Sequence, residues 1–364
     1  MNRRVLLKQI GAGLTIIGAG QFKTFATPVN NPSIRTGDQP IRLSSNENPY
    51  GPAPIARAAM AESIAGSNRY NWNTASDLIA AIARKNNVTD DNILIGPGST
   101  EILDLTFRLS EYREGSFIIA NPSYSSWTKT AETSGLRKIS VPLTSDKRHD
   151  LPAMLSAIQA DTRFVYVCNP NNPTGTICDH QSLVTFIQEA TKRTTVIVDE
   201  AYLDFTEQSS VSSLTSDNKN LIIVKTFSKI YGLAGARTGY AMAHKDTIDK
   251  LSRLQTWPNG GISVVSRAGA IASLKAGDFV KQCYARNEET RKYTIEQLTR
   301  LNITCVPSHT NFIYFSLANY SKDFFGLLKS NNIQGTNIYE EDGRWTRITV
   351  GSMQEMQQFV AAIK

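Results

Sequence analysis

Thr226-Phe227-Ser228-Lys229 follows a run of apolar residues, 221–224, that has the composition of a buried strand. The lysine has a hydroxyl group beside it, and Arg237 comes eight residues later in Gly235-Ala236-Arg237-Thr238-Gly239. A site for pyridoxal phosphate needs an amine that forms a Schiff base and donors that hold a phosphate group. The alternative is a solvated lysine at a strand end, which is the commoner situation for a single lysine. Motifs elsewhere in the chain distinguish the two interpretations.

Helical and strand-like segments alternate from about residue 53 to residue 243. The strand-like runs are short, apolar and without clean alternation, which is typical of strands buried on both faces of a sheet. Helices are expected at residues 54–65, 74–85, 100–108, 126–133, 152–159 and 182–190, and strands at 116–120, 137–141, 164–168, 195–198, 221–224 and 239–243. The pattern predicts an α/β fold with a large, mainly parallel sheet.

The pattern changes after residues 257–261. A long charged helix is expected first, and short strands and helices follow it in the manner of a smaller α+β domain. These elements are predicted at 278–301, 303–306, 312–315, 322–330, 345–350 and 354–363. The predicted organisation is a leader at 1–26, an arm that contributes to the small domain at 27–69, a large cofactor-binding domain at 70–275, and a small domain at 276–364.

Polar residues follow two of the expected strands. The run from Asn169 to Gly175 reads NPNNPTG, and Asp199-Glu200-Ala201-Tyr202 comes after the next strand. Because carboxyl ends of parallel strands open into a ligand crevice, the first loop can hold an asparagine against a ligand, although an ordinary Asn-Pro turn is the alternative. The acid can pair with a protonated pyridine nitrogen, and Tyr202 can reach the ring's phenolic oxygen. A metal site is the alternative for the two acids, but four histidines and four cysteines show no ligand spacing, so we expect no metal.

Gly96-Pro97-Gly98-Ser99-Thr100-Glu101 opens an expected helix. The amides at a helix start form an anion site, and a simple N-cap made by Ser99 is the alternative. Tyr124 follows the strand at 116–120, where it can stack on a planar ring or simply pack at the rim.

In this order the motifs resemble the fold-type I pyridoxal phosphate aminotransferases of class I/II, and most closely the histidinol-phosphate aminotransferase family. The resemblance covers most of the chain after about residue 41. It begins with the sequence LSSNENPYGP from Leu43 to Pro52 and ends with Arg347-Ile348-Thr349-Val350-Gly351.

The resemblance implies that Lys229 forms the Schiff base with the cofactor and moves a proton. It also implies cofactor contacts, made to the ring by Tyr124, Asn172, Asp199 and Tyr202 and to the phosphate by Ser99, Thr100, Ser228 and Arg237. Tyr70 would reach the phosphate of the neighbouring subunit in a homodimer. Arg347 would bind the substrate's acidic group, since its planar fork suits a carboxylate, and Asn46 would be a further substrate contact.

The predicted reaction moves an amino group between an amino acid or amine, with an aromatic or imidazole ring, and a 2-oxo acid. One departure bears on the substrate: members of the family usually carry an arginine near the segment Ile333-Gln334-Gly335-Thr336, where this chain has none, and Arg344 is the nearest. A decarboxylase or lyase acting on a phosphorylated amino acid is an alternative with nearly the same motifs. A non-catalytic periplasmic binding protein is another, but it would have no use for Lys229.

The amino-terminal segment resembles a twin-arginine export signal. It combines Arg3-Arg4 with a glycine-rich apolar run at 10–20 and small residues before Ala26, and it is too short to span a membrane. Export of a folded, cofactor-loaded protein to the periplasm is expected, with a cytoplasmic arm as the alternative. The formal net charge is +7, and four of the positive charges fall in residues 1–26. The remaining +3 gives no reason to expect a nucleic-acid partner.

Overall fold

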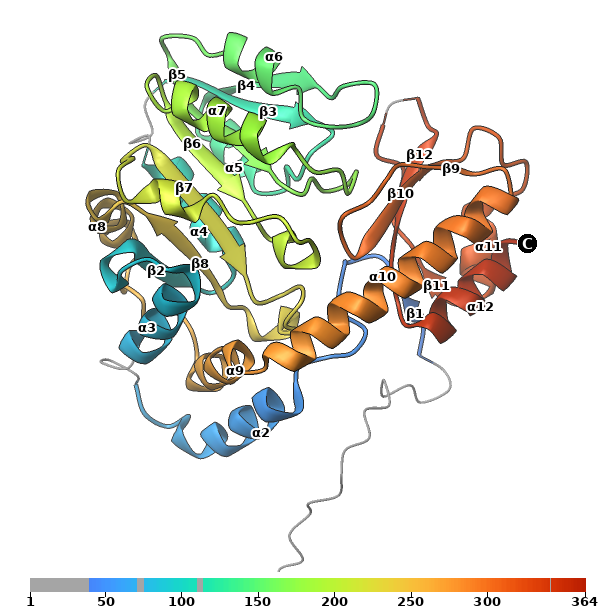
Figure 1. The fold of residues 1–364 in the computed structure, drawn as a ribbon, viewed down its shortest axis with the longest axis horizontal. Coiled ribbons are helices and arrows are strands. Elements are labelled where there is room, and N and C mark those ends of the chain that lie inside the picture. Colours follow the sequence, from blue (N-terminus) through green and yellow to red (C-terminus); the bar gives the residue numbers. More distant parts are fainter. Residues whose placement is uncertain (1–38, 71–74, 110–113, 341) are drawn as a thin grey trace, which may run out of the picture. The chain divides into compact units, whose positions relative to one another are not determined.

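The computed structural model describes residues 39–70, 75–109, 114–340 and 342–364. Its largest sheet has seven strands in the order β2-β8-β7-β6-β5-β3-β4 (Figure 1). Their bounds are β2 Ile93–Gly96, β3 Gly115–Asn121, β4 Leu136–Pro142, β5 Thr162–Cys168, β6 Thr195–Asp199, β7 Leu221–Thr226 and β8 Gly239–Ala243. The pairs from β7 to β4 are parallel, while β8 is antiparallel to both β7 and β2. The expected α/β fold with a mainly parallel sheet is confirmed.

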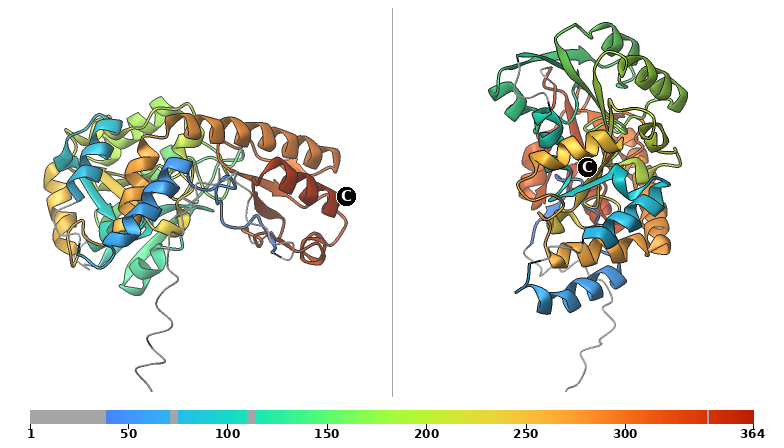
Figure 2. Two further views of the ribbon diagram at one scale, coloured as in Figure 1. Left: turned by 90° about the horizontal axis from the view of Figure 1, so that it is seen from below. Right: turned by 90° about the vertical axis from the view of Figure 1, so that its left-hand side faces the viewer.

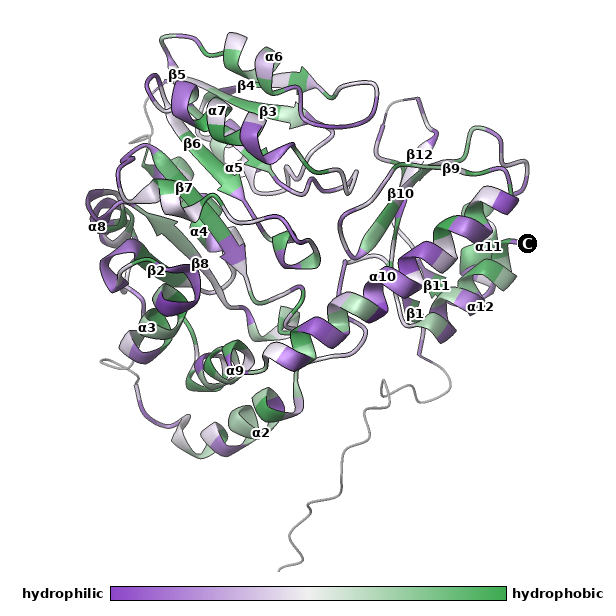
Figure 3. Cartoon of the chain, in the orientation of Figure 1, coloured by the Kyte–Doolittle hydropathy of each residue, from purple (hydrophilic) through white to green (hydrophobic). Residues whose placement is uncertain are grey.

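The strands of this sheet are largely apolar (Figure 3), and a hydrophobic core lies on each of its faces. In β5, Val165 and Val167 enter one hydrophobic core while Phe164 and Tyr166 enter the other, because successive side chains point to opposite faces. Helices α3 Ala75–Asn86, α6 Leu151–Ser156, α7 His180–Ala190 and α9 Val264–Leu274 pack into the first core, and α4 Ser99–Arg108, α5 Thr128–Thr133 and α8 Lys245–Leu254 into the second. The sheet is therefore a middle layer between two layers of helices.

A third core lies around a three-stranded antiparallel sheet in the order β12-β10-β9. Its strands are β9 Thr304–Cys305, β10 Phe312–Ser316 and β12 Trp345–Thr349, and the helices packed on it are α11 Phe324–Ser330 and α12 Met353–Ile363. A parallel pair, β1 Ile41–Arg42 with β11 Ile333–Gln334, brings the chain before α2 Pro54–Ser63 to the same core.

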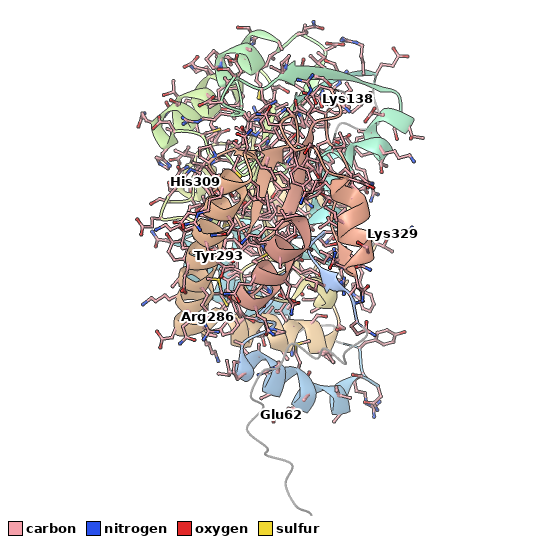
Figure 4. The ribbon with its side chains drawn as sticks, turned by 90° about the vertical axis from the view of Figure 1, so that its right-hand side faces the viewer. Glu62, Lys138, Arg286, Tyr293, His309 and Lys329 are labelled. Atoms are coloured by element: carbon pink, nitrogen blue, oxygen red, sulfur yellow. The ribbon has the colours of Figure 1, made fainter. Side chains whose placement is uncertain are left out.

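The long helix α10 Gly277–Arg300 connects the two regions (Figure 2). Cys283 in its first half belongs to a core of the large sheet, and Leu298 near its end belongs to the third core. Arg286 and Tyr293 mark its course in Figure 4, where Lys329 marks α11. The predicted domain boundaries, including the division at residue 276, stay a prediction.

Most expected elements are present within a few residues of their predicted ends. β2, α8 and α9, together with the two-residue strands β1 and β11, were not predicted. α8 has a narrow apolar stripe in a sequence that is charged at half of its positions, and α9 is built largely from small residues without a marked apolar stripe. Ser99 is the first helical residue of α4 and Gly98 is its N-cap, so the N-cap interpretation of Ser99 was wrong. Over the described part of the chain, every helix is too short or too polar to cross a membrane.

Candidate active site

The carboxyl ends of β5, β6 and β7 and the start of α4 surround a pocket of about 650 Å³. That volume is in the range of small-molecule sites, and its position at the strand ends is the one expected for this fold class. The pocket is lined by eleven of the twelve predicted site residues: Asn46, Ser99, Thr100, Tyr124, Asn172, Asp199, Tyr202, Ser228, Lys229, Arg237 and Arg347. Tyr70 lies elsewhere. It is 73 % exposed, and its ring centroid is 5.5 Å from that of Trp257.

Asp199 is the last residue of β6 and is almost completely buried. Its Oδ2 accepts a hydrogen bond from the Tyr166 hydroxyl (2.9 Å), and its Oδ1 accepts one from the Ala201 amide (3.0 Å). Burial raises the pKa of Asp199 to about 6, although these two hydrogen bonds and the nearby Lys229 oppose the rise. A carboxylate held in this way can face one positively charged nitrogen in a ligand.

Lys229 stands three residues beyond the end of β7, in the turn that leads to Arg237. Its Nζ donates to the Ser45 carbonyl (3.2 Å) and lies 5.4 Å from the centroid of the Tyr202 ring. Burial lowers the pKa of Lys229 to about 8, and the positive charges of Arg347 and Arg237 act in the same direction. A far larger fraction of this amine is therefore neutral near physiological pH than of an ordinary lysine, and the neutral form can act as a nucleophile or base.

Close backbone packing builds an anion site at the start of α4. Gly98 has φ +91°, and a Cβ there would lie 2.4 Å from Nη2 of Arg237. A Cβ on Gly239 would lie 2.3 Å from the Ser99 amide nitrogen. Both glycines are thus needed for Arg237 and the amides of Ser99 and Thr100 to reach the same place, where the helix start favours an anion.

Hydrogen bonds within the segment 226–237 hold Ser228 and Arg237 beside this anion site. The Ser228 hydroxyl accepts from Thr226 at 2.9 Å and lies 3.5 Å from Nη1 of Arg237. Arg237 has left-handed backbone geometry, φ 52°, and also donates to the Ala234 carbonyl at 3.0 Å. Sequence reasoning did not assign a role to Thr226, although it is part of the motif that marks the site.

A second network joins the large sheet to β12. Nη1 of Arg347 donates to Oδ1 of Asn172 (2.5 Å), and Nη2 donates to the Ser44 carbonyl (2.6 Å). The Tyr202 hydroxyl accepts from the side-chain amides of Asn46 (3.0 Å) and Asn172 (3.4 Å). Nε of Arg347 is buried and has no hydrogen-bond partner among the described residues. Arg347 is thus positioned from two sides and still has an unused donor.

Two aromatic residues of the site were missed by sequence reasoning. Tyr166 lies inside β5, where its only sequence signal is that of a core residue, yet its hydroxyl holds Asp199. Tyr339 lies in the loop between β11 and β12 and lines the pocket, with its ring centroid 5.4 Å from the Arg347 guanidinium carbon. Tyr124 is half-buried at the pocket wall, as expected for a residue that can stack on a ring.

The arrangement fits pyridoxal phosphate. The cradle at Gly98 and Gly239 matches a phosphate, the buried Asp199 matches a protonated ring nitrogen, and Lys229 offers the amine. In the described portions of the chain, no group of three or more histidine, cysteine, aspartate and glutamate side chains could hold a metal ion.

Comparison with known proteins agrees with this geometry. Residues 38–363 match the family model described as aminotransferase class I and II. The histidinol-phosphate aminotransferase of Moorella thermoacetica is 34 % identical over 330 residues, which are 89 % of this chain and 84 % of the relative. The aromatic amino acid aminotransferase of Cutibacterium acnes is 31 % identical over 339 residues, 92 % of this chain and 95 % of the relative.

Solved structures show the same fold. The histidinol-phosphate aminotransferase of Sinorhizobium meliloti, in complex with pyridoxal-5'-phosphate, superposes with a TM-score of 0.82 at 27 % identity, covering 89 % of this chain and 90 % of that one. A putative histidinol-phosphate aminotransferase from Erwinia carotovora atroseptica superposes with a TM-score of 0.82 at 29 % identity, covering 89 % of this chain and 95 % of that one. The chain belongs to the aminotransferase class I and II family and is a pyridoxal phosphate-dependent aminotransferase.

Proposed function

We propose that the amino donor is an amino acid with an aromatic or imidazole ring, and that a 2-oxo acid accepts the amino group. The observation that carries this proposal is the set of cations around the pocket. The described lining residues include three cations, Lys229, Arg237 and Arg347. With Lys229 and Arg237 assigned to the cofactor, Arg347 remains for the substrate, and its planar fork matches one carboxylate. Tyr339 beside it offers an aromatic wall for a ring.

Histidinol phosphate is the second candidate, because several relatives, including the one from Moorella thermoacetica, are named for it. Among the described lining residues, Arg347 is the one cation that remains for the substrate, so it alone would bind the phosphate of histidinol phosphate. The segment where the family carries a further arginine holds Ile333-Gln334-Gly335-Thr336, and these residues do not line the pocket. Arg344 is exposed and does not line it either. A single arginine balances the one negative charge of a carboxylate but only part of the charge of a phosphate dianion.

Three residues of the pocket have separate roles in the proposed reaction. Bound pyridoxal phosphate supplies an electron sink for the charge that develops at the substrate's α-carbon. Lys229, with its lowered pKa, takes the proton from that carbon and returns it at another position. Asp199 keeps its negative charge opposite the ring nitrogen, and Arg347 orients the substrate through its carboxylate.

A substrate panel tests the proposed donor. Phenylalanine, tyrosine, tryptophan, histidine and histidinol phosphate are each offered with 2-oxoglutarate, and both the keto product and any released carbon dioxide are measured. We expect the highest kcat/KM for an aromatic amino acid or histidine. A tenfold or greater preference for histidinol phosphate would favour the second candidate, and release of carbon dioxide would favour the decarboxylase alternative.

We also propose that the enzyme acts as a homodimer in which Tyr70 serves the neighbour's phosphate site. The support is that Tyr70 is strongly exposed, lies outside the pocket of its own chain, and follows a segment where Ile55 and Ile64 are more than half exposed. Mixing inactive Lys229→Ala subunits with weakened Tyr70→Phe subunits should form hybrids with one complete site, and activity should rise above that of either variant. A fully active monomer would contradict the proposal.

We propose further that residues 1–26, which lie outside the described residues, direct export of the folded protein to the periplasm. The support is the sequence Arg3-Arg4 followed by the glycine-rich apolar run. Replacing both arginines by lysine keeps the charge and should trap the protein in the cytoplasm. A native protein that stays in the cytoplasm with its leader intact would show that the leader is only an arm.

A further inference from the structure

Lys147 and Glu340 form an ion pair between two loops that adjoin residues of the pocket. Nζ of Lys147 lies 2.7 Å and 2.8 Å from the two carboxylate oxygens of Glu340, and the side chains are only 19 % and 20 % exposed. Lys147 belongs to the loop between β4 and α6 at the large sheet, and Glu340 to the loop between β11 and β12 at the small sheet. The pair therefore connects two regions with separate hydrophobic cores.

On the side of the large sheet, Lys147 is held in a tight turn. Its amide donates to the Thr144 carbonyl (2.9 Å), and its φ of 63° is left-handed, which few non-glycine residues adopt without such support. The Lys147 carbonyl accepts from the Thr176 hydroxyl (2.7 Å). The Thr176 carbonyl in turn accepts from the Asn171 amide (2.8 Å), in the loop that presents Asn172 to the pocket. Lys147 is thus fixed to the same loop as a site residue.

On the side of the small sheet, Glu340 is held by aromatic residues. The Tyr314 hydroxyl donates to its Oε1 at 2.7 Å, and Nζ of Lys147 lies 4.5 Å from the centroid of the Trp345 ring, which stacks on Tyr314. The residue before Glu340 is Tyr339, whose amide donates to the Trp345 carbonyl at 2.9 Å. The tyrosine that lines the pocket beside Arg347 is therefore adjacent in sequence to the ion pair.

These contacts form a closed path that includes three residues of the pocket, Asn172, Tyr339 and Arg347. The Asn172 loop connects to Lys147, Lys147 to Glu340, and Tyr339 to Arg347, which returns to Asn172 through its 2.5 Å hydrogen bond. A largely shielded ion pair must offset the cost of desolvating both charges, so its presence is weak evidence for a role in stability alone. Its geometry is well defined, because Lys147 engages both oxygens of Glu340 and lies over the aromatic face of Trp345.

We propose that Lys147 and Glu340 are positioning residues that hold Tyr339 and Arg347 in register with the cofactor side of the pocket. The pair thereby sets the affinity for the substrate's carboxylate and ring without touching either. This inference rests on the proposed role of Arg347 as the substrate's carboxylate site.

The test compares Lys147→Met and Glu340→Gln with Lys192→Met, which removes an exposed lysine paired with Glu189 in an ordinary surface ion pair. Lys147→Met and Glu340→Gln are called the bridge variants. In the cofactor-loaded enzyme, each bridge variant should raise KM for the amino donor about tenfold while kcat changes less than about twofold. The KM of the double variant should be no higher than that of either single variant, because each substitution removes the same interaction. Lys147→Arg should restore most of the affinity, and Lys192→Met should behave as wild type.

Two readouts separate this inference from the proposed function. Hydrogen exchange of residues 335–340 should rise in both bridge variants and not in Lys192→Met, whatever the substrate is. Binding of maleate, a dicarboxylate that is not turned over, should weaken about tenfold in the bridge variants, as measured by calorimetry. Unchanged exchange, or increased exchange with unchanged maleate affinity, would overturn the inference. A wild-type enzyme that binds no carboxylate would overturn the assigned role of Arg347 and the inference with it, even with turnover intact.

Discussion

Lys225 and Lys229 lie four residues apart, and the structure gives them opposite surroundings. Nζ of Lys225 is buried 3.5 Å from a Glu200 carboxylate oxygen. Burial alone would lower the pKa of Lys225, but the carboxylates of Asp204 and Glu200 hold it above its ordinary value. Lys229 faces the pocket, where burial first and then the cations Arg347 and Arg237 lower its pKa to about 8. Lys225 is therefore a fixed charge, while Lys229 can exchange its proton.

Capture of added pyridoxal phosphate by the cofactor-free protein should depend on pH with a midpoint near 8. Below that pH Lys229 is protonated and cannot attack, so the rate should fall about tenfold per pH unit and level off above pH 8. Arg347→Gln removes a charge that lowers the pKa, so its midpoint should move to higher pH. Stopped-flow absorbance measures both profiles, and a midpoint near the ordinary lysine value in the wild type would contradict the account.

Affinity for the cofactor should decrease as the pH falls through about 6, because Asp199 then takes up a proton and no longer opposes the ring nitrogen. The Tyr166 hydrogen bond favours the charged form of Asp199. Tyr166→Phe should therefore raise the pKa of Asp199 further and move the loss of affinity to higher pH. Equilibrium titrations at several pH values check this, and a shift to lower pH in the variant would refute the assignment.

The raised pKa of Asp199 also predicts a pH-dependent stability. The folded cofactor-free protein holds this proton more tightly than the unfolded chain, so its free energy of unfolding should decline as the pH rises from about 4 to about 6. Asp199→Asn should remove that part of the slope. Urea unfolding of the wild type and of Asp199→Asn between about pH 4 and pH 6 measures this difference. Identical slopes of unfolding free energy against pH in the two proteins would contradict the prediction.

Gly98→Ala should weaken cofactor binding by about 1–3 kcal/mol, since the new Cβ would meet Arg237 and the backbone has positive φ. Gly277→Ala is the matched control because a Cβ there meets nothing within 4 Å. Dissociation constants for pyridoxal phosphate measure the effect. Equal affinities in the two variants would show that the start of α4 does not bind the phosphate.

Arg347→Lys should raise KM for the amino acid and the 2-oxo acid by about 30- to 100-fold, because a lysine cannot reproduce two parallel hydrogen bonds to a carboxylate. It would also lose the contact with Asn172. Steady-state kinetics with both substrates test this. If neither KM changes, the substrate's carboxylate binds elsewhere.

Sequence patterns predicted the large sheet and the pocket residues because strand-end motifs are local. The residues 221–224 and the TFSK motif after them are continuous in the chain, so the position of Lys229 follows directly. Tyr166 could not be predicted as a site residue because its role depends on the pairing of β5 with β6, where Cys168 lies opposite Asp199. The ion pair could not be predicted because Lys147 and Glu340 are 193 residues apart in sequence and meet only in the folded chain. The position of Tyr339, which precedes Glu340, depends on the same tertiary contact. α8 and α9 were missed because their apolar faces are narrow or made of small side chains.

Reductive trapping identifies the lysine that binds the cofactor. The cofactor-loaded protein is treated with borohydride, digested and analysed by mass spectrometry, so that the lysine joined to pyridoxal phosphate is identified. The modification is expected on Lys229 and not on Lys225, which lies within β7 one residue before its end and is held by Glu200. Modification of Lys225, or of no lysine in a protein that retains full transaminase activity, would contradict this expectation.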